Sequence, residues 1–214
     1  MKEQELERLK NMLQIEESLY EKGFEYICGI DEAGRGPLCG PVVAAAVVLP
    51  KECCIEGVND SKKLSEKKRE VVYEKIMEQA LAVGIGIGSV EDIEEKNILN
   101  ATKGAMKQAL ENLSILPDYV LVDGNQMISI EIPGETVVSG DAKSESIAAA
   151  SIVAKVTRDH MLLNWDKEYP EYGFAKHKGY GTKAHIEAIQ KYGLCPLHRP
   201  SFCKKFVTEK GGEK

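Results

Sequence analysis

The sequence predicts a single α/β domain, because strand-like and helix-like segments alternate along a chain of ordinary globular composition. Its 214 residues fall within the range of one large domain, and 43% hydrophobic with 29% charged residues argues against a disordered chain. Short apolar runs of strand length recur between longer segments that carry apolar residues at helical spacing. We find no internal repeat and no low-complexity linker, so we expect one domain.

The N-terminal segment, residues 1–22, predicts an amphipathic helix that ends at Gly23, and we treat it as an N-terminal helical extension. Residues 23–206 form the predicted main domain, and residues 207–214 form a polar tail. Within the main domain, strands are predicted at residues 26–31, 42–49, 83–90, 119–122 and 136–138. Helices are predicted at residues 66–80, 91–113, 144–165 and 182–192.

The first two predicted strands are buried runs joined by a charged turn region, which begins at the adjacent acids Asp31 and Glu32. Burying neighbouring carboxylates is costly unless a cation or a basic group compensates their charge. Residues 82–90 alternate glycine with valine or isoleucine. This period of two indicates a strand with one closely covered face; a phosphate-binding loop would need a GxGxxG or GKS/GKT pattern.

Acids stand at or near the ends of several predicted strands: Asp31 with Glu32, then Asp123, and then Asp141 before the long alanine-rich helix. Each acid alone is compatible with a turn or a helix cap. Because strand ends converge in an open α/β sheet, the four carboxylates could also share one pocket. Such an oxygen-rich set, without clustered histidine or cysteine, favours Mg²⁺ or Mn²⁺, two of which can promote phosphodiester hydrolysis.

Asp159 is a fifth acid that we place outside this set. On a continuous helix it would lie roughly 27 Å from Asp141, at 1.5 Å per residue. We therefore expect it to pair with Arg158 or with a nearby lysine.

The charge and cysteine patterns indicate a cytoplasmic protein without a membrane segment. The first segment is charged throughout, and no apolar run approaches the ~20 residues of a membrane helix. The six cysteines show no CxxC spacing, which favours reduced thiols over disulfides or zinc. Net charge is −6, yet residues 141–214 carry a local excess of positive charge. This asymmetry is compatible with a polyanionic substrate and equally with an ordinary solvated surface.

The chain resembles the bacterial ribonuclease HII family from about residue 26 to residue 202. The motifs that carry the resemblance are GIDEAGRGPLCGPVVAAAVVL, DSKKLS, VDGN, SGDAKSESIAAASIVAKVTRD, YPEYGFAKHKGYGT and HRPSF. The resemblance implies a ribonuclease-H-like fold, with a mixed five-stranded sheet whose first three strands are antiparallel, flanked by helices and followed by a helical C-terminal part. It also implies an endonuclease that cuts RNA–DNA hybrids and single ribonucleotides in duplex DNA, leaving 3′-hydroxyl and 5′-phosphate ends.

Site residues follow from the same resemblance. It implies that Asp31, Glu32, Asp123 and Asp141 are the catalytic acids that hold two Mn²⁺ or Mg²⁺ ions. The Gly34-Arg35-Gly36 loop would read the ribose 2′-hydroxyl, where missing side chains allow close backbone approach. Tyr180 would pack on the sugar that follows the ribonucleotide. Phosphate contacts are assigned to Ser61, Lys62, Lys143 and Lys178, although for the lysines a solvated surface role stays open.

Two other functions are compatible with parts of this pattern. A nucleic-acid-binding module of the same fold would be expected to lack one of the acids. A resolvase-like or integrase-like nuclease would be expected to lack the glycine loop and the tyrosine of KGYGT. We expect a monomer, and the role of residues 1–22 is left open.

Overall fold

The structure is a computed structural model that describes residues 3–207. Its centre is a five-stranded sheet in the order β3-β2-β1-β4-β5. The strands are β1 (Ile27–Ala33), β2 (Val42–Val48), β3 (Ala82–Gly88), β4 (Tyr119–Asp123) and β5 (Gly134–Val137). β1, β2 and β3 pair antiparallel, whereas β4 and β5 run parallel to β1. The predicted mixed sheet with three antiparallel strands first is confirmed.

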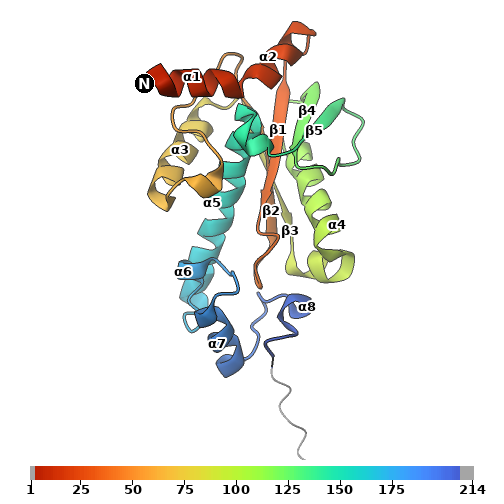
Figure 1. Cartoon of the computed structure of the whole chain (residues 1–214). Helices are drawn as coiled ribbons and strands as arrows, with labels where there is room; N and C mark the ends of the chain where they lie inside the picture. The colour runs from red at the N-terminus through yellow and green to blue at the C-terminus, as the bar shows by residue number, and fades with distance from the viewer. Residues whose placement is uncertain (1–2, 208–214) are drawn as a thin grey trace, which may run out of the picture.

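Helices cover both faces of this sheet (Figure 1). The long helix α5 (Glu145–Glu168) packs on one face with α3 (Glu66–Gln79) outside it, and α4 (Val90–Glu111) packs on the other face. The remaining helices lie at the two ends of the molecule. They are α1 (Glu3–Met12), α2 (Gln14–Glu21), α6 (Phe174–His177), α7 (Lys183–Tyr192) and α8 (Pro200–Cys203), with short 3₁₀ turns η1 (Ser61–Lys63) and η2 (Gly140–Ala142).

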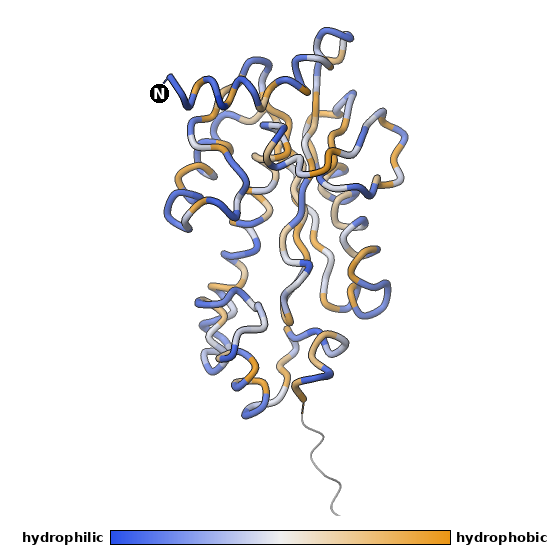
Figure 2. The backbone as a smooth tube through the Cα atoms, viewed as in Figure 1, coloured by the Kyte–Doolittle hydropathy of each residue, from blue (hydrophilic) through white to orange (hydrophobic). Residues whose placement is uncertain are grey.

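β2 divides the hydrophobic core into two layers. All seven of its residues are buried, because α5 covers one face of this strand and α4 covers the other. Successive strand residues point to opposite faces, so Ala45 and Val47 join the layer under α5, and Ala44 and Ala46 join the layer under α4. Figure 2 shows the apolar residues gathered along the central strands.

The glycines of β3 allow helix α4 to approach the sheet closely. A Cβ atom added at Gly86 would lie 1.9 Å from the Ala105 carbonyl oxygen, and one at Gly84 would lie 2.0 Å from that of Ala109. No side chain fits in these positions without moving the helix backbone. The predicted strand with a closely covered face is therefore confirmed.

Two local predictions differ from the structure. The N-terminal segment forms two helices that meet at Leu13, because Leu9 packs under α3 and α5 while Leu19 packs against the start of β1. Gly23 nevertheless ends the second helix as predicted, with a φ of +94° and hydrogen bonds from Gly23 and Phe24 to the preceding turn. In addition, Asp31 and Glu32 lie inside β1 rather than in a turn, since pairing with β2 continues to Ala33.

Within residues 3–207 the structure contains no helix that combines the length and the apolar composition needed to cross a bilayer. All six cysteines are free thiols.

Candidate active site

The end of β1 and the end of β4 lie side by side in the sheet. Their parallel register pairs Ile27 with Tyr119 and continues to Ile30 with Val122, so the next residues in register are Asp31 and Asp123. Alternation along both strands directs these two acids toward α5. Glu32 follows Asp31 and therefore starts from the opposite face of β1, but its pKa is affected by Asp123, so its carboxylate is close to the same edge.

Asp141 reaches this edge from the 3₁₀ turn η2, between β5 and α5. The Asp123 carboxylate accepts a 2.6 Å hydrogen bond from the Gly140 amide, which fastens the turn to the end of β4. The Ser144 side chain then caps α5 by accepting from the Ile147 amide. The structure thus places the four acids predicted from the sequence near one edge of the sheet, close enough for their charges to influence one another.

Burial and mutual repulsion raise the pKa of Asp31, Glu32 and Asp141. For Asp31, burial is the larger cause, and the Glu32 and Asp123 carboxylates add to it. The pKa of Glu32 is also raised, mainly by burial, although the neighbouring Arg35 guanidinium opposes the shift at 3.3 Å. For Asp141, burial again comes first, followed by the nearby carboxylates of Asp60 and Asp123. The site therefore holds more negative charge than its own basic groups compensate.

The loop before α3 contributes a further acid and a base to this site. Lys62 Nζ lies 3.8 Å from Asp141 Oδ2. Burial alone would lower the pKa of its ammonium, but the surrounding carboxylates, first Asp31 and then Asp141, raise it overall. Asp60 accepts from the Lys62 amide at 2.9 Å and lies close enough to Asp141 to affect its pKa. Asp60 was not predicted as a site residue from the sequence, although its position in DSKK close to Lys62 was a usable signal.

The donor set at this edge fits a hard divalent cation. It consists of carboxylates on two adjacent strand ends and one neighbouring turn, and a bound cation would oppose the raised pKa values of Asp31, Glu32 and Asp141. Among residues 3–207, no three His, Cys, Asp or Glu side chains are gathered into a complete cluster of metal ligands. The acids lie near one another and carry negative charge that a cation would compensate. The fit to a divalent cation therefore rests on their oxygen ligands and on their charge.

The glycine loop after β1 is held from behind by Arg199. This guanidinium is fully buried and donates hydrogen bonds of 2.6–3.0 Å to four backbone carbonyls, those of Gly34, Arg35, Pro37 and Gly40. Between residues 3 and 207, the amides of residues 34–36 donate to no other protein group. The carbonyls of Gly34 and Arg35 therefore face the protein, and the exposed residues Arg35 and Gly36 have amides without a protein acceptor.

A second buried arginine, Arg158 of α5, ties the glycine loop to the segment that carries Tyr180. It donates to the carbonyls of Cys39, Pro41 and Lys178 at 2.9–3.0 Å. Gly34 has a φ of +96°, and a Cβ there would lie 2.1 Å from Nε of this arginine. Only glycine fits this position. Arg199 was not singled out from the sequence, and Arg158 was considered only as a partner of Asp159, although both arginines stand inside the quoted motifs, in VTRD and HRPSF.

Tyr180 lies beside the exposed end of the same loop. A Cβ added at Gly36 would be 3.8 Å from Cε1 of the tyrosine ring, and the ring is 46% exposed. The Leu38 amide donates to the Gly179 carbonyl at 2.8 Å, which joins the two segments. The predicted sugar-reading residues are thus adjacent.

The predicted phosphate-contacting residues fall into two groups. Lys62 and Lys143 are exposed, and Lys143 also donates to the Val138 carbonyl at 2.7 Å. Ser61 is buried and accepts from Ser151. Lys178 is also buried, and its ammonium donates to the Ala175 carbonyl at 2.6 Å and to Glu66 at 3.2 Å. The structure therefore gives Ser61 and Lys178 internal contacts.

Asp159 lies away from the acid cluster, as expected. It pairs with Lys155 at 2.6 Å and with Arg69 at 3.4 Å. The expected lysine partner is confirmed, but Arg158 is not hydrogen-bonded to Asp159 because its three guanidinium nitrogens are used by backbone carbonyls.

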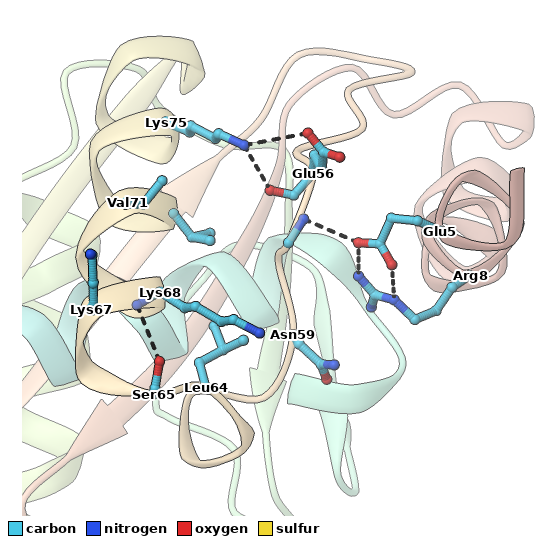
Figure 3. A pocket seen from close by; sticks show the side chains of 12 residues that line it. Glu5, Arg8, Glu56, Asn59, Leu64, Ser65, Lys67, Lys68, Val71 and Lys75 are labelled. Atoms are coloured by element: carbon cyan, nitrogen blue, oxygen red, sulfur yellow. Dashed lines mark hydrogen bonds and ion pairs between the residues drawn. The ribbon is translucent and has the colours of Figure 1, made fainter. Parts of the chain in front are cut away.

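A depression of about 650 Å³ lies between α1, the loop before η1 and α3 (Figure 3). Its acids are already paired: Glu5 with Arg8 at 2.7 Å, and Glu56 with Lys75 at 3.7 Å. Its floor includes the apolar side chains of Leu64, Val71 and Val72. It carries no unpaired acid and is separate from the four-carboxylate edge.

Comparisons with known proteins agree on one family. The family model described as Ribonuclease HII matches residues 28–205. The chain is 58% identical over 206 residues to Ribonuclease HII of Acetivibrio thermocellus, covering 96% of this chain and 80% of that protein. It is 58% identical over 203 residues to Ribonuclease HII of Clostridioides difficile, covering 95% and 80%.

Solved structures show the same fold. Ribonuclease H2 from Pyrococcus horikoshii OT3 superposes with a TM-score of 0.71 at 29% identity, over 85% of this chain and 96% of that one. The RNase HII of Archaeoglobus fulgidus, solved as a complex with PCNA, gives 0.70 at 26% identity, over 81% and 93%. An RNase HIII in complex with Mn²⁺ gives 0.59 at 17% identity, over 81% and 65%, a likeness of fold alone.

Proposed function

The chain belongs to the ribonuclease HII family and is a ribonuclease H endonuclease, and from this premise we propose its substrate and the roles of its residues. We propose that it cuts the RNA strand of RNA–DNA hybrids and single ribonucleotides in duplex DNA, leaving 3′-hydroxyl and 5′-phosphate ends. The observation that carries this proposal is the position of the acid-bearing strand β1, which leads directly into a loop whose amides have no acceptor among the described residues.

The four acids Asp31, Glu32, Asp123 and Asp141 would hold two divalent ions, Mg²⁺ or Mn²⁺. Bound there, such ions supply Lewis acidity toward the scissile phosphate and lower the pKa of water. The protein's own contribution is to hold the carboxylates next to one another in spite of their repulsion, through the strand register and the 2.6 Å bond from Gly140 to Asp123.

The glycine loop would recognise the ribose. With its carbonyls bound by Arg199, the loop presents amide donors, and a 2′-hydroxyl is an acceptor that DNA lacks. Gly36 is exposed and has no side chain to keep a sugar away. Tyr180, adjacent to Gly36, would pack on the sugar that follows the ribonucleotide.

Exposed cations around the acids would hold the backbone phosphates. Lys62 and Lys143 remain in this proposal because both are exposed next to the acid edge. Lys143 and Lys63 also line a depression of about 500 Å³ that Ala142 connects to the turn of Asp141. Ser61 and Lys178 would act indirectly, since both are buried in internal hydrogen bonds.

The most informative substrate is a DNA duplex with one ribonucleotide, compared with a uniform RNA–DNA hybrid and an all-DNA duplex. We expect Mg²⁺-dependent or Mn²⁺-dependent cleavage of the first two and none of the third. Asp31→Asn and Asp123→Asn should abolish cleavage while leaving the far-ultraviolet circular dichroism unchanged. Asp159→Asn is the matched control, because it also removes a buried carboxylate but one outside the site. It should retain cleavage activity.

Three results would redirect the proposal. Full activity of a clean Asp31→Asn preparation would refute the assignment of the acids. Cleavage of long hybrids without cleavage at a single ribonucleotide would place the enzyme nearer type HIII. Activity on all-DNA junctions alone would favour a resolvase-like nuclease.

We further propose a monomer that acts in the cytoplasm. Six free cysteines are typical of a reducing compartment. Sedimentation equilibrium should give a mass near 23.6 kDa, and a mass twice as large would contradict this proposal.

A further inference from the structure

A chain of three hydrogen bonds runs from Cys195 to Tyr180 through two buried imidazoles. The Cys195 amide donates to His198 Nδ1 at 3.0 Å. His198 Nε2 and His185 Nε2 lie 3.1 Å apart, and His185 Nδ1 lies 3.0 Å from the Tyr180 carbonyl oxygen. Segments that are 15 residues apart in sequence are thereby connected through side chains alone.

The two ends of this chain determine where both protons sit. A carbonyl oxygen can only accept, so His185 must carry its hydrogen on Nδ1. A backbone amide can only donate, so Nδ1 of His198 must be bare. In neutral rings the hydrogen of His198 is then on Nε2, and it donates to the bare Nε2 of His185. Every donor faces an acceptor, so the chain is complete with both rings neutral.

The surroundings of the two rings keep them neutral. His185 is 0% exposed and His198 is 2% exposed. His185 stacks on His177 with ring centroids 4.3 Å apart. Phe174 packs against the rings of both His185 and His198, which we call the histidine relay. Burial lowers the pKa of each ring to about 4, with the neighbouring imidazoles as a further cause. An added proton would place two N–H groups against each other at the Nε2–Nε2 contact.

The series of hydrogen bonds ends at the main chain of Tyr180, a residue of the candidate active site. The Tyr180 carbonyl also accepts from the Thr182 amide at 2.8 Å, and the Tyr180 amide donates to His177. The main chain of Tyr180 is thus fixed on both sides, although its ring is half-exposed beside Gly36. A side chain that must meet a sugar from solvent depends on such backbone anchors for its position.

We propose that His185 and His198 are positioning residues that act through Tyr180, and that they set how well the enzyme recognises the sugar following the ribonucleotide. This inference rests on the proposed role of Tyr180 in sugar packing. Neither histidine touches the substrate, and the relay supplies geometry rather than a proton.

The test compares cleavage of a single-ribonucleotide duplex with cleavage of a uniform hybrid. The variants are His185→Phe, which keeps ring shape and removes both hydrogen bonds, and His185→Asn, whose amide can still donate to the Tyr180 carbonyl. His198→Phe interrupts the relay one step further away. His160→Gln is the matched control, because this exposed histidine pairs with Glu70 on α3 and lies outside the relay.

We expect His185→Phe to lower kcat/KM on the single-ribonucleotide duplex at least tenfold more than on the uniform hybrid. His185→Asn should recover most of the loss, and His160→Gln should match the wild type. Selectivity is the ratio of kcat/KM on the single-ribonucleotide duplex to kcat/KM on the uniform hybrid. In the double variant Tyr180→Ala with His185→Phe, this selectivity should fall no further than in Tyr180→Ala alone, because both changes remove the same contact. Equal losses on both substrates, or additive losses in the double variant, would overturn the relay.

Tyr180→Ala by itself separates the two proposals. If its selectivity equals that of the wild type, the proposed role of Tyr180 fails. If its selectivity drops while that of a folded His185→Phe protein does not, only the relay fails. Nitrogen-15 NMR of the imidazoles gives a readout that needs no activity: we expect the Nδ1–H tautomer for His185 and the Nε2–H tautomer for His198. The opposite tautomers would contradict the hydrogen-bond chain.

Discussion

At the scale of single residues, the site and its support depend on buried acids with different partners. Glu145 begins α5 and is fully buried, with Oε1 accepting the Ile55 amide at 2.6 Å. Burial raises its pKa from 4.5 to about 8, and the Glu16 carboxylate adds to the shift while Arg8 opposes it. With a pKa of about 8, the Glu145 carboxyl group is mostly protonated at neutral pH. It therefore binds the Ile55 amide, in the loop before Lys62, as a neutral acid.

This raised pKa predicts a pH-dependent stability. The folded-state value lies above the unfolded-state value, so the contribution is complete below about pH 4.5 and is lost as pH rises through about 8. Each pKa unit corresponds to about 1.4 kcal/mol, so the free energy of unfolding should fall by up to a few kcal/mol. Glu145→Gln should show a smaller decline between pH 5 and 8 in urea titrations without metal.

The control for this measurement is Glu17→Gln, since Glu17 is exposed on α2. Other buried acids contribute equally to the wild type and to both variants, so the difference between curves isolates Glu145. Parallel curves for wild type and Glu145→Gln would mean that the carboxyl group is ionised in the folded protein.

At the scale of elements, the N-terminal helices brace the start of α5. Glu16 of α2 accepts from the Ser144 and Ser146 hydroxyls at 2.6 Å and from the Ser146 amide at 3.1 Å. On α1, Arg8 donates to the Val58 carbonyl at 2.6 Å. Both contacts fall beside segments that carry active-site residues, which gives the previously unassigned extension a structural role.

Glu16→Ala should therefore lower the free energy of unfolding by roughly 1–3 kcal/mol, because the buried serine hydroxyls and the amide would lose their acceptor. Glu17→Ala, one residue further along the same helix and exposed, should change it by less than about 0.5 kcal/mol. Urea unfolding followed by circular dichroism measures both. Equal stability of the two variants would show that the helix docks without this carboxylate.

The contact between β3 and α4 predicts opposite outcomes for two glycine substitutions. Gly86→Ala should destabilise by more than about 3 kcal/mol, because its Cβ would overlap the Ala105 carbonyl and displace the helix backbone. Gly104→Ala should stabilise by about 0.5–1 kcal/mol, because Gly104 is exposed in the middle of α4 with nothing within 4 Å of the added Cβ. Thermal unfolding distinguishes the two, and a tolerated Gly86→Ala would refute the close packing.

At the scale of the whole molecule, a chain with a net charge of −6 must bind a polyanion through a local cationic surface. Lys62 lies 3.8 Å from Asp141, and Lys143 is exposed two residues after Asp141. Each phosphate contact contributes about 0.9 to the slope of log K against log salt. Lys62→Ala and Lys143→Ala should each reduce that slope by about 0.9 in binding titrations with Ca²⁺.

Lys107→Ala is the control for this measurement, because Lys107 pairs with Glu111 on the exposed side of α4. It should leave the slope unchanged. A slope that is unaffected in Lys62→Ala or in Lys143→Ala would remove that lysine from the phosphate-binding surface.

The strands, the main helices and the candidate acids could be predicted from the sequence, because these features follow from local periodicity and from motifs that are contiguous along the chain. The sequence could not determine that Asp31 and Glu32 lie within a strand, since pairing with β2 rather than local propensity extends β1 to Ala33. Asp60 was missed as a neighbour of the site for a similar reason: its proximity to Asp141 depends on where a loop folds back.

Which polar side chains face the site and which are internal depends on the three-dimensional fold. Lys178 and Ser61 stand in motifs typical of substrate contact, yet both are buried and hydrogen-bonded inside the protein. Arg158 and Arg199 gave no signal of their own, because their partners are backbone carbonyls more than 100 residues away or in separate loops. Hydrogen bonds to backbone leave no pattern in the partner's side chains, so the frame behind the glycine loop becomes visible only in three dimensions.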